Sequence, residues 1–460
     1  MDQLSGLALP PTVEDRRSAC PGLFRMAKAL DGSICRVKLT FGDLNTDQAR
    51  SVADAARRFG NGIIEITNRA NLQIRGVRPE TESSLIDALL MVGLGPLTDR
   101  GDDVRNVMIS PIAGLNKSKI DVRPLSLRLL AALQTNATYQ TLSPKFCVLV
   151  DGGESLAMVE HPHDLWLSPI NPDDPSTRYA FGVAGVPPTK IDDQPALGSV
   201  DAEKAFDLIT TLLDLFIDWN RHHPTASRLR HMIADIGTDS LVRRVEQRLD
   251  HRVRSEDLAD WRRTLPQRNG HLGIQPDGDG SSWLVGAMPP LGRLNPDMLR
   301  SLADLADRHS NGKLRMTPWQ SIFLPEVSTE TAKRARADLE SLGLTVDPQQ
   351  PLATMISCSG SAGCGSALAA TREDGLKLAA LLREKTLVPQ IHMSGCSKSC
   401  ASPSAKPITL VATDPGHYDI FLRATNGPSR FGKLLAANVT IEEAAALIGE
   451  NSGSGGPLHA

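Results

Sequence analysis

The sequence predicts an α+β protein of 460 residues, built as a duplicated two-domain unit that we write A-B-A′-B′. The first observation is an internal repeat: residues 42–77 align without a gap on residues 292–327, and 14 of the 36 positions are identical. A second, weaker repeat has nearly the same offset of 250 residues and relates 107–110 to 354–357 and 130–133 to 378–381. The third observation is that four of the seven cysteines fall in the second copy of this weaker repeat, so one copy is specialised.

Each copy of the stronger repeat predicts a strand, a helix and two further strands. Val37 and Leu39 alternate with basic residues as in a strand, and Asn45 then caps a helix with Gln48 at the capping-box position. Asn295 starts the second helix in the same way. Apolar residues recur at helical spacing within each helix and alternate after it. Because a unit of this size cannot complete a sheet, we expect the two copies to pair into one ferredoxin-like domain.

The repeats divide the chain into five predicted segments. These are a first ferredoxin-like half over 1–90, a first α/β domain without a cluster over 91–255, a second ferredoxin-like half over 256–340, a second α/β domain with a cluster over 341–450, and a disordered tail over 451–460. Residues 171–201 are rich in proline and aspartate and are expected to form a loop.

Composition excludes several classes of protein. A net charge of −3, from 50 basic and 53 acidic residues, argues against a partner nucleic acid and against a polybasic membrane surface. The most apolar stretch is interrupted by Asp214 and Asp218, so no membrane span is expected. The first 17 residues lack the basic and apolar regions of a targeting signal. We therefore expect a cytoplasmic protein whose cysteines serve metal, cluster or redox chemistry rather than disulfides.

Four cysteines form two closely spaced pairs. Five residues separate Cys358 from Cys364, and three separate Cys396 from Cys400. Each pair follows a short apolar segment and lies among glycines, which allow backbone N–H groups to approach an anionic centre. Four thiolates on two glycine-rich turns suit a 4Fe-4S cluster. The alternatives are a structural zinc site, which prefers a gap of about two to four residues in each pair, and unrelated buried thiols.

These cysteines and two further segments resemble the sirohaem-type sulfite and nitrite reductase superfamily. The two segments are Ile66-Thr67-Asn68-Arg69 and Pro144-Lys145-Phe146. The A-B-A′-B′ organisation is also that of the superfamily, so the resemblance covers essentially the whole chain. It implies a duplicated nitrite/sulfite reductase-like fold around a tetrapyrrole cavity. It also implies that Cys400 matches the cysteine that ligates the cluster and bridges to the sirohaem iron.

Cations that match the superfamily's cavity lining are predicted to bind tetrapyrrole carboxylates. Burial of such carboxylates requires charge-assisted partners, for which arginine is well suited. Arg36 and Lys38 alternate on one strand face, where two cations without an opposing anion would be unfavourable; a solvated basic edge is the alternative. Arg69 and Lys145 are also predicted to be catalytic. The predicted carboxylate-binding residues are Arg36, Lys38, Arg69, Arg75, Lys145 and Arg315.

Three departures from the reductase pattern make six-electron reduction of an anion doubtful. Reductases usually have a second lysine where this chain has Cys147, and they tend to have Arg-Gln where it has Arg69-Ala70. Between the last two cluster cysteines they often have Pro-Asn, whereas this chain has Ser397-Lys398-Ser399. The run from Ser394 to Ala401 and the segment 17–23 instead resemble the precorrin-3B synthases of aerobic cobalamin biosynthesis.

Resemblance to the precorrin-3B synthases implies a monooxygenase that hydroxylates precorrin-3A at C20 with dioxygen and forms a γ-lactone. It implies a 4Fe-4S cluster that delivers electrons from an external donor, a reductase or a ferredoxin, because the sequence has no nucleotide-binding fingerprint. A further mononuclear non-haem iron is also implied, without assigned ligands. His161, His163 and Asp164 have the residue types that such an iron favours, and an exposed polar loop is the alternative origin of this string. The alternatives are a sirohaem-dependent sulfite or nitrite reductase, and a non-catalytic cluster or zinc protein that binds tetrapyrroles.

Overall fold

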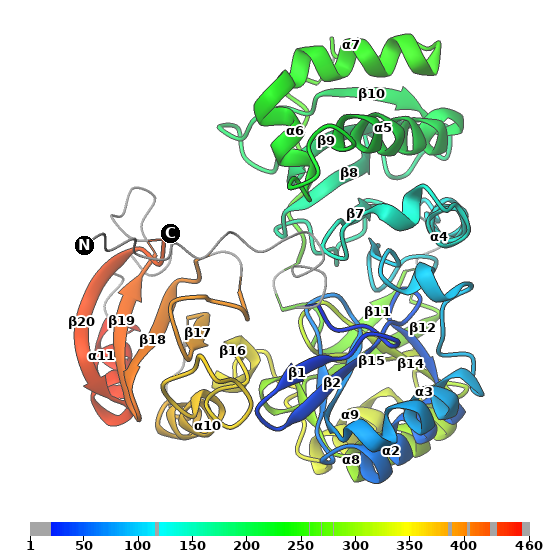
Figure 1. Cartoon of the computed structure of the whole chain (residues 1–460). Coiled ribbons are helices and arrows are strands. Elements are labelled where there is room, and N and C mark those ends of the chain that lie inside the picture. Colours follow the sequence, from blue (N-terminus) through cyan, green and yellow to red (C-terminus); the bar gives the residue numbers. More distant parts are fainter. Residues whose placement is uncertain are drawn as a thin grey trace, which may run out of the picture.

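The computed structural model describes residues 20–115, 119–256, 258–267, 269–278, 280–384, 389–402, 405–423 and 430–452. These residues form three lobes (Figure 1). One lobe contains both ferredoxin-like halves, A and A′, and each α/β domain, B or B′, forms a lobe of its own. The α+β fold class and the order A-B-A′-B′ are therefore as predicted.

The two ferredoxin-like halves consist of matching elements. Those of A are β1 (Ala27–Ala29), β2 (Gly32–Val37), β3 (Asp43–Asn45), α2 (Thr46–Phe59), β4 (Ile64–Ile66), β5 (Leu72–Val77) and α3 (Glu82–Leu90). Those of A′ are β11 (Gly273–Asp277), β12 (Ser282–Ala287), β13 (Arg293–Leu294), α8 (Pro296–His309), β14 (Lys313–Met316), β15 (Ile322–Val327) and α9 (Ala332–Ser341). Both predicted helix starts are confirmed, because the side chain of Asn45 accepts a hydrogen bond from the Gln48 backbone and that of Asn295 accepts one from the Met298 backbone.

The halves complete each other by exchanging an edge strand. Strand β13 of A′ pairs with β4 in the sheet β1-β2-β5-β4-β13, and β3 of A pairs with β14 in the sheet β11-β12-β15-β14-β3. Buried residues from both halves form one hydrophobic core, to which α2 and α8 contribute. The predicted pairing of the two copies is thus present, as two sheets with one core rather than one closed sheet.

Opposite charges mark the two exchanged seams. Arg293 lies opposite Glu65, with 2.7 Å between Nη2 and Oε1, and Asp43 lies opposite Arg315, with 2.5 Å between Oδ1 and Nε. In the repeat, Asp43 corresponds to Arg293 and Glu65 corresponds to Arg315. If each half kept its own edge strand, two carboxylates would face each other in A and two guanidinium groups in A′. Like charges directly opposite are unfavourable, so the charges favour the exchanged arrangement.

The two α/β domains share one sheet topology, which accounts for the weaker repeat. In each sheet three parallel strands are followed by two antiparallel ones, in the orders β6-β7-β8-β9-β10 and β16-β17-β18-β19-β20. The elements of B are β6 (Val107–Met108), α4 (Arg123–Thr135), β7 (Val148–Val150), β8 (His163–Pro169), β9 (Arg178–Gly185), β10 (Gly198–Asp201), α5 (Ala205–Asn220), α6 (Leu229–Ile236) and α7 (Thr238–Leu249). The elements of B′ are β16 (Met355–Ser357), α10 (Thr371–Leu381), β17 (Ile391–Ser394), β18 (Ile408–Asp414), β19 (His417–Leu422), β20 (Lys433–Thr440) and α11 (Ile441–Ser452).

Two expectations about irregular segments need correction. The prediction of a loop over 171–201 is wrong, because β9 and β10 lie within it and pair with each other. Tyr179 and Phe181 are buried there, and their alternation is the strand signal that the proline and aspartate content concealed. Helix α11 runs to Ser452, two residues into the predicted tail, and 453–460 lie outside the described residues. Short 3-10 helices span Pro79–Thr81, Asp99–Asp102, Tyr139–Thr141, Ala202–Lys204, Pro290–Gly292 and Pro351–Thr354.

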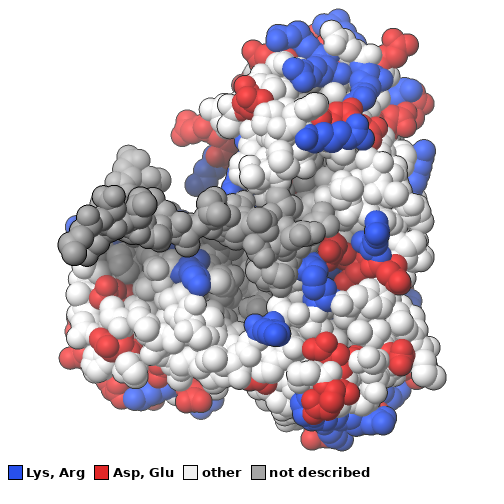
Figure 2. All heavy atoms as spheres, in the orientation of Figure 1, with Lys and Arg blue, Asp and Glu red and all other residues white. Residues whose placement is uncertain are grey.

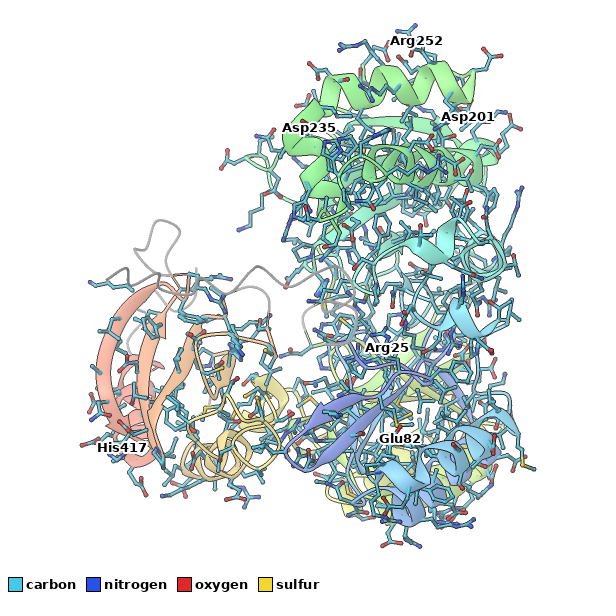
Figure 3. All side chains as sticks on the ribbon, viewed as in Figure 1. Arg25, Glu82, Asp201, Asp235, Arg252 and His417 are labelled. Carbon is cyan, nitrogen blue, oxygen red and sulfur yellow. The ribbon has the colours of Figure 1, made fainter. Side chains whose placement is uncertain are left out.

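Basic and acidic side chains are intermingled on the face drawn in Figure 2. Figure 3 labels Arg252 and Asp201 on the outer part of B and His417 on B′, whereas Arg25 lies where A meets B. Arg25 forms an ion pair with Asp103, which fastens the start of A to B. Within the described part of the chain, no helix has both the length and the apolar composition needed to cross a membrane.

Candidate active site

Strand β2 and the residue after it present two cations on the same face of the A sheet. The guanidinium of Arg36 donates to the side-chain oxygen of Gln73 on β5, from Nε at 3.1 Å and from Nη2 at 2.6 Å. Lys38 is only 5% exposed, and its Nζ donates to the backbone oxygens of Asp102 and, at 3.0 Å, Asp103. The alternation that the sequence predicts for Arg36 and Lys38 is therefore present.

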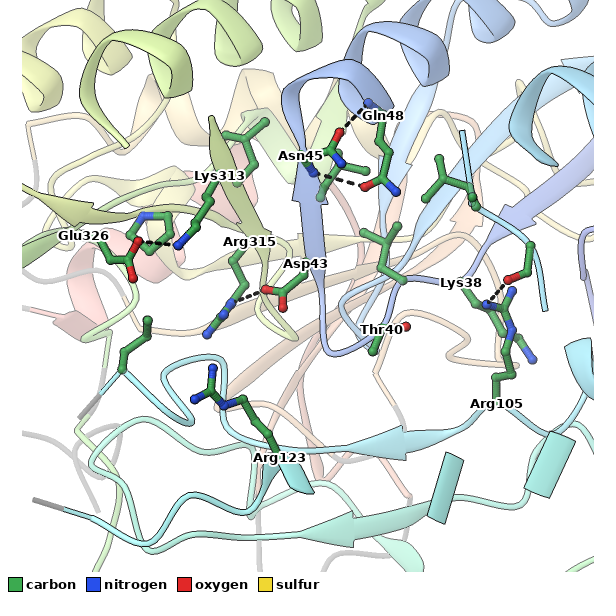
Figure 4. Close-up of a pocket in the computed structure, with 18 residues that line it drawn as sticks. Lys38, Thr40, Asp43, Asn45, Gln48, Arg105, Arg123, Lys313, Arg315 and Glu326 are labelled. Atoms are coloured by element: carbon green, nitrogen blue, oxygen red, sulfur yellow. Dashed lines mark hydrogen bonds and ion pairs between the residues drawn. The ribbon is translucent and has the colours of Figure 1, made fainter. Parts of the chain in front are cut away.

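Lys38 lines a cavity of about 420 Å³ where A, A′ and B meet (Figure 4). Burial lowers the pKa of Lys38 to about 7, the charge of Asp102 opposes this effect, and the nearby Arg105 adds to the lowering. Arg105 donates to Asp102 Oδ1 at 2.9 Å, while its buried Nε has no partner. Lys38 can therefore exchange a proton near neutral pH, and an anion bound beside it would raise its pKa.

Arg69 is held by a tight turn between β4 and β5. The hydroxyl oxygen of Thr67 accepts hydrogen bonds from the backbone N–H groups of Arg69, at 3.3 Å, and Asn71, at 3.1 Å. Ala70 adopts a left-handed φ of 54° inside this turn. The guanidinium of Arg69 donates from Nη2 to the backbone oxygen of Lys145 at 3.3 Å, so the turn of A reaches B. Arg69 and Lys145, the two residues predicted to be catalytic, are thus neighbours.

Four of the six predicted carboxylate-binding cations have no carboxylate partner. Arg36, Lys38, Arg69 and Lys145 make no ion pair within 4.0 Å in the part of the chain that the structure describes. Burial lowers the pKa of Arg36 to about 10, and the charge of Arg69 lowers it further. Lys38 is buried, Arg36 and Arg69 are partly exposed, and Lys145 is exposed. A bound anion would supply the counter-charge that these cations lack.

The other two predicted cations are engaged in internal ion pairs. Arg75 is 2% exposed and donates to both carboxylate oxygens of Asp31, from Nε at 2.9 Å and from Nη2 at 2.7 Å. Glu65 lies 3.4 Å from Nη1 of Arg75. Arg315 pairs with Asp43 and donates from Nη1 to the backbone oxygen of Pro111 at 2.9 Å. The structure therefore separates Arg75 and Arg315 from the four unpaired cations.

The four cysteines of B′ lie on the turns that follow β16 and β17. The Sγ atom of Cys358 accepts a hydrogen bond from the Gly395 backbone at 3.2 Å and lies 3.5 Å from the hydroxyl of Thr371, the first residue of α10. Burial raises the pKa of the Cys400 thiol, and the charges of Cys396, Cys358 and Cys364 raise it further. One backbone donor, the N–H of Gly395, therefore points at the Cys358 sulfur, and the Thr371 hydroxyl donates to the backbone oxygen of Cys358 at 3.1 Å.

The four free cysteines of B′ are the residues that would hold a 4Fe-4S cluster. No three histidine, cysteine or acidic side chains in the described residues gather as the ligands of one metal ion do, and the four cysteines are all described. A side chain at Gly395 would crowd this turn, because a Cβ there would lie 2.6 Å from Ala367 Cβ and 3.4 Å from the Cys358 sulfur.

A second cavity, of about 110 Å³, lies between the turn that holds Arg69 and the turn that holds Cys400. Asn68 lines it from the turn of A, His161 from B and Trp319 from A′. Ala401 and Ser402, which directly follow Cys400, line it from B′. The fold thus brings residues next to the predicted catalytic Arg69 and residues next to the predicted bridging Cys400 to one cavity.

The candidate ligands of a non-haem iron, His161, His163 and Asp164, are not brought together. Asp164 directly follows His163 on β8, so its side chain points to the opposite face of the strand. There both of its carboxylate oxygens accept hydrogen bonds from Nε of Arg228 at 2.9 Å. His163 Nε2 lies 3.4 Å from the sulfur of Met108, and the rings of His161 and His163 meet edge to face at 5.4 Å. Burial lowers the pKa of His161 to about 4. The structure gives this iron site no support.

Sequence reasoning missed two groups that line these cavities. Arg105 reaches Lys38 from the segment before β6, and a lone arginine in a turn gives no periodic signal. Trp319 occupies the repeat position of Arg69 and stacks on His271 with 5.0 Å between ring centroids. The repeat alignment contained that signal, because Trp319 follows Thr317 as Arg69 follows Thr67.

Comparisons with known families agree with this architecture. Residues 100–253 match the family described as the nitrite and sulphite reductase 4Fe-4S domain. Residues 27–92 and 274–342 match the nitrite/sulfite reductase ferredoxin-like half domain. The first match falls on B, whereas the four cysteines lie in B′, which has the same sheet topology as B.

Individual relatives are similar over most of the chain. A chloroplastic ferredoxin–nitrite reductase of Zea mays is 31% identical over 87% of this chain and 73% of its own length. A precorrin-3B synthase of Sinorhizobium sp is 27% identical over 94% of this chain and 90% of its own length. The solved structure of the Mycobacterium tuberculosis NirA protein superposes with a TM-score of 0.74 at 20% identity, over 93% of this chain and 82% of that one, which shows a shared fold.

Proposed function

The chain belongs to the nitrite and sulfite reductase family of oxidoreductases, and from that premise we propose that it is a precorrin-3B synthase. The proposed substrate is precorrin-3A, which is hydroxylated at C20 by dioxygen and closes a γ-lactone. The relative from Sinorhizobium supports this proposal, because the alignment spans 90% of that synthase but only 73% of the maize nitrite reductase.

The observation that carries the proposal is a neutral, buried residue near Arg69, packed in an apolar cluster with Met108 and Leu149. Cys147, at the position where the reductases usually have a second lysine, is 1% exposed. Burial raises the pKa of the Cys147 thiol while Arg69 acts in the opposite direction, so the thiol stays protonated and neutral near pH 7. A neutral thiol cannot supply the proton that a lysine ammonium would give to a small oxyanion.

In the proposed complex the chain binds substrate through its unpaired cations. Arg36, Arg69 and Lys145 supply charge-assisted hydrogen bonds to the carboxylates and orient the macrocycle. Lys38, with a pKa of about 7, binds a carboxylate as its ammonium form and can return a proton when the site empties.

Cys358, Cys364, Cys396 and Cys400 are the proposed ligands of a 4Fe-4S cluster. When bound, that cluster supplies single electrons from an external donor, either a reductase or a ferredoxin. The reaction balances with one oxygen atom in the product and the other in water, for which the donor provides two electrons and the solvent two protons. The Gly395 N–H and the Thr371 hydroxyl hold Cys358 in place for this role.

Incubation of the anaerobically prepared protein with precorrin-3A, a chemical reductant and isotopically labelled dioxygen tests the proposal. One labelled oxygen atom in the tetrapyrrole product is expected, and absence of incorporation by a protein that retains its iron would overturn it. The variant Cys400→Ser should lose iron, whereas Cys20→Ser, outside the ligand set, should keep it.

A sirohaem-dependent nitrite or sulfite reductase is the second candidate. The 31% identity to the maize enzyme favours it. The absorption spectrum of the anaerobically purified protein separates the two: haem bands at one equivalent per chain favour the reductase, and a broad iron–sulfur shoulder without haem bands favours the synthase.

A further inference from the structure

A row of polar side chains crosses the A sheet from Arg36, one of the four unpaired cations, toward the cysteine turns. Arg36 on β2 lies opposite Gln73 on β5, and Gln73 lies opposite Glu65 on β4. Arg75 is two residues beyond Gln73 and therefore presents its side chain on the same face. The row thus consists of Arg36, Gln73, Glu65 and Arg75, and we call it the polar row.

Hydrogen bonds connect the polar row without a break. Arg36 Nη2 donates to Gln73 Oε1 at 2.6 Å, and Gln73 Nε2 donates to Glu65 Oε2 at 3.3 Å. Arg75 Nη1 donates to the same oxygen of Glu65 at 3.4 Å. Glu65 is 4% exposed and Arg75 is 2% exposed, so solvent screens these charges weakly.

One end of the polar row is fixed to the turn between the first two cysteines. Arg75 Nη1 donates to Ser359 Oγ at 3.0 Å, and Nη2 donates to the backbone oxygen of Gly363 at 3.1 Å. Ser359 directly follows Cys358, and Gly363 directly precedes Cys364. The other end, Arg36, belongs to the unpaired cations.

The duplicated half A′ shows that the fold does not require such a row. In the twin sheet the same register places Gly286, Phe323 and Arg315 side by side, at the positions that correspond to Arg36, Gln73 and Glu65. Phe323 is fully buried among apolar residues and interrupts any hydrogen-bonded path. Only the half that contacts the cysteine turn carries the connection.

We propose that the polar row couples anion binding at the four unpaired cations to the redox state of the cluster. The inference rests on the proposed function, because it requires both the anionic tetrapyrrole and the cluster. An anion on Arg36 neutralises the positive end of the row, and the altered polarisation reaches the cysteine turn through Gln73, Glu65 and Arg75. Anion binding therefore lowers the reduction potential of the cluster, and reduction of the cluster weakens anion binding by the same factor.

A redox titration of the full chain with and without uroporphyrin, a carboxylate-rich macrocycle, tests the coupling. The cluster takes one electron from a dithionite-reduced mediator, and its spin signal reports the reduced fraction. A coupling of about tenfold, within the usual range for linked sites, corresponds to about 59 mV for a one-electron couple. The affinity for uroporphyrin, measured on oxidised and reduced wild-type protein, should differ by the same factor. Equal affinities for the two redox states would overturn the inference without recourse to any variant.

The variant Gln73→Met cuts the middle of the polar row without changing charge or much volume. The uroporphyrin-induced shift should fall to less than half, whereas Arg293→Gln should keep it. Arg293 serves as the matched control because it pairs with the other oxygen of Glu65, outside the path. If uroporphyrin still shifts the reduction potential of Gln73→Met as much as that of the wild type, the coupling acts directly through space. That result would overturn the proposed path through the polar row. If Gln73→Met lowers iron content, Gln73→Asn, too short to reach both partners, carries the same expectation.

Failure of the proposed function has a different signature. A wild-type protein without iron, or one that does not bind uroporphyrin, would overturn the proposed function and this inference together. A protein that has both properties and shows no shift overturns the coupling alone.

Discussion

Substitution of Gly363 by alanine should loosen the first cysteine turn by a steric clash with Arg75. A Cβ at this position would lie 2.4 Å from Arg75 Nη2 and 3.1 Å from Arg75 Cζ. The guanidinium cannot retreat easily, because Asp31 holds it with two hydrogen bonds and the side chain is 2% exposed. Overpacking of this kind costs about 1–3 kcal/mol. The proposed cluster requires the native turn, so this loss of stability lowers the affinity of the protein for the cluster. At about 1.4 kcal/mol per factor of ten, the affinity falls about 5- to 160-fold.

Iron release to a chelator measures this effect, and Gly365→Ala is the matched control. Gly365 lies in the same turn on the other side of Cys364, and a Cβ there would meet only Leu30, at 3.7 Å, an ordinary van der Waals contact. We expect rapid iron loss from Gly363→Ala and wild-type retention in Gly365→Ala. Equal retention in the two variants would refute the argument that Arg75 packs against the cysteine turn.

Three other expectations concern charge. The affinity for uroporphyrin should fall as pH rises through about 7, because the ammonium form of Lys38 binds the carboxylate and is lost above its pKa. In a binding assay across pH 6–9, the affinity of Lys38→Met should depend less on pH. Asp43→Arg places two guanidinium groups opposite each other at an exchanged seam and should lower the stability by about 0.5–1 kcal/mol, and Arg315→Glu in the same chain should restore it; thermal unfolding measures both, and failure of the second change to rescue would count against the charge argument. Arg263→Met leaves Asp151, which is fully buried, without the guanidinium that lies 2.6 Å away, and should destabilise B by about 3–5 kcal/mol, seen as an early transition in a calorimetric scan; an unchanged scan would contradict this account.

Local sequence patterns predicted the architecture well because they depend on nearby residues. The capping residues Asn45 and Asn295 act within one helical turn, so their effect can be read without the rest of the molecule. The repeat predicted that two halves pair, and the inverted charges of Asp43 and Arg293 were already visible in the alignment. That these charges lie on exchanged edge strands required the strand register.

The candidate site was predicted in part, and the missing part concerns which charges neutralise one another. Arg36 and Arg75 have the same side chain and both lie on strands of A. Only the packed structure shows that Arg75 is paired with Asp31 and bonded to a turn 288 residues away, whereas Arg36 has no carboxylate partner. The sequence likewise gave Asp164 as a ligand candidate, but Arg228 approaches it from a distant helix start and neutralises it.

The sequence by itself determined the duplication, the helix starts, the two cysteine turns and the residue types that favour an anionic ligand beside a cluster. These features follow from periodicity and spacing along the chain, which backbone geometry translates directly into structure. Tertiary structure alone decided which cations lack a carboxylate partner and which, such as Arg75, form internal ion pairs. It also decided that Gln73 and Glu65 connect Arg36 to Arg75. A cation's partner is set by three-dimensional packing, and residues far apart in the sequence carry no local signal of that contact.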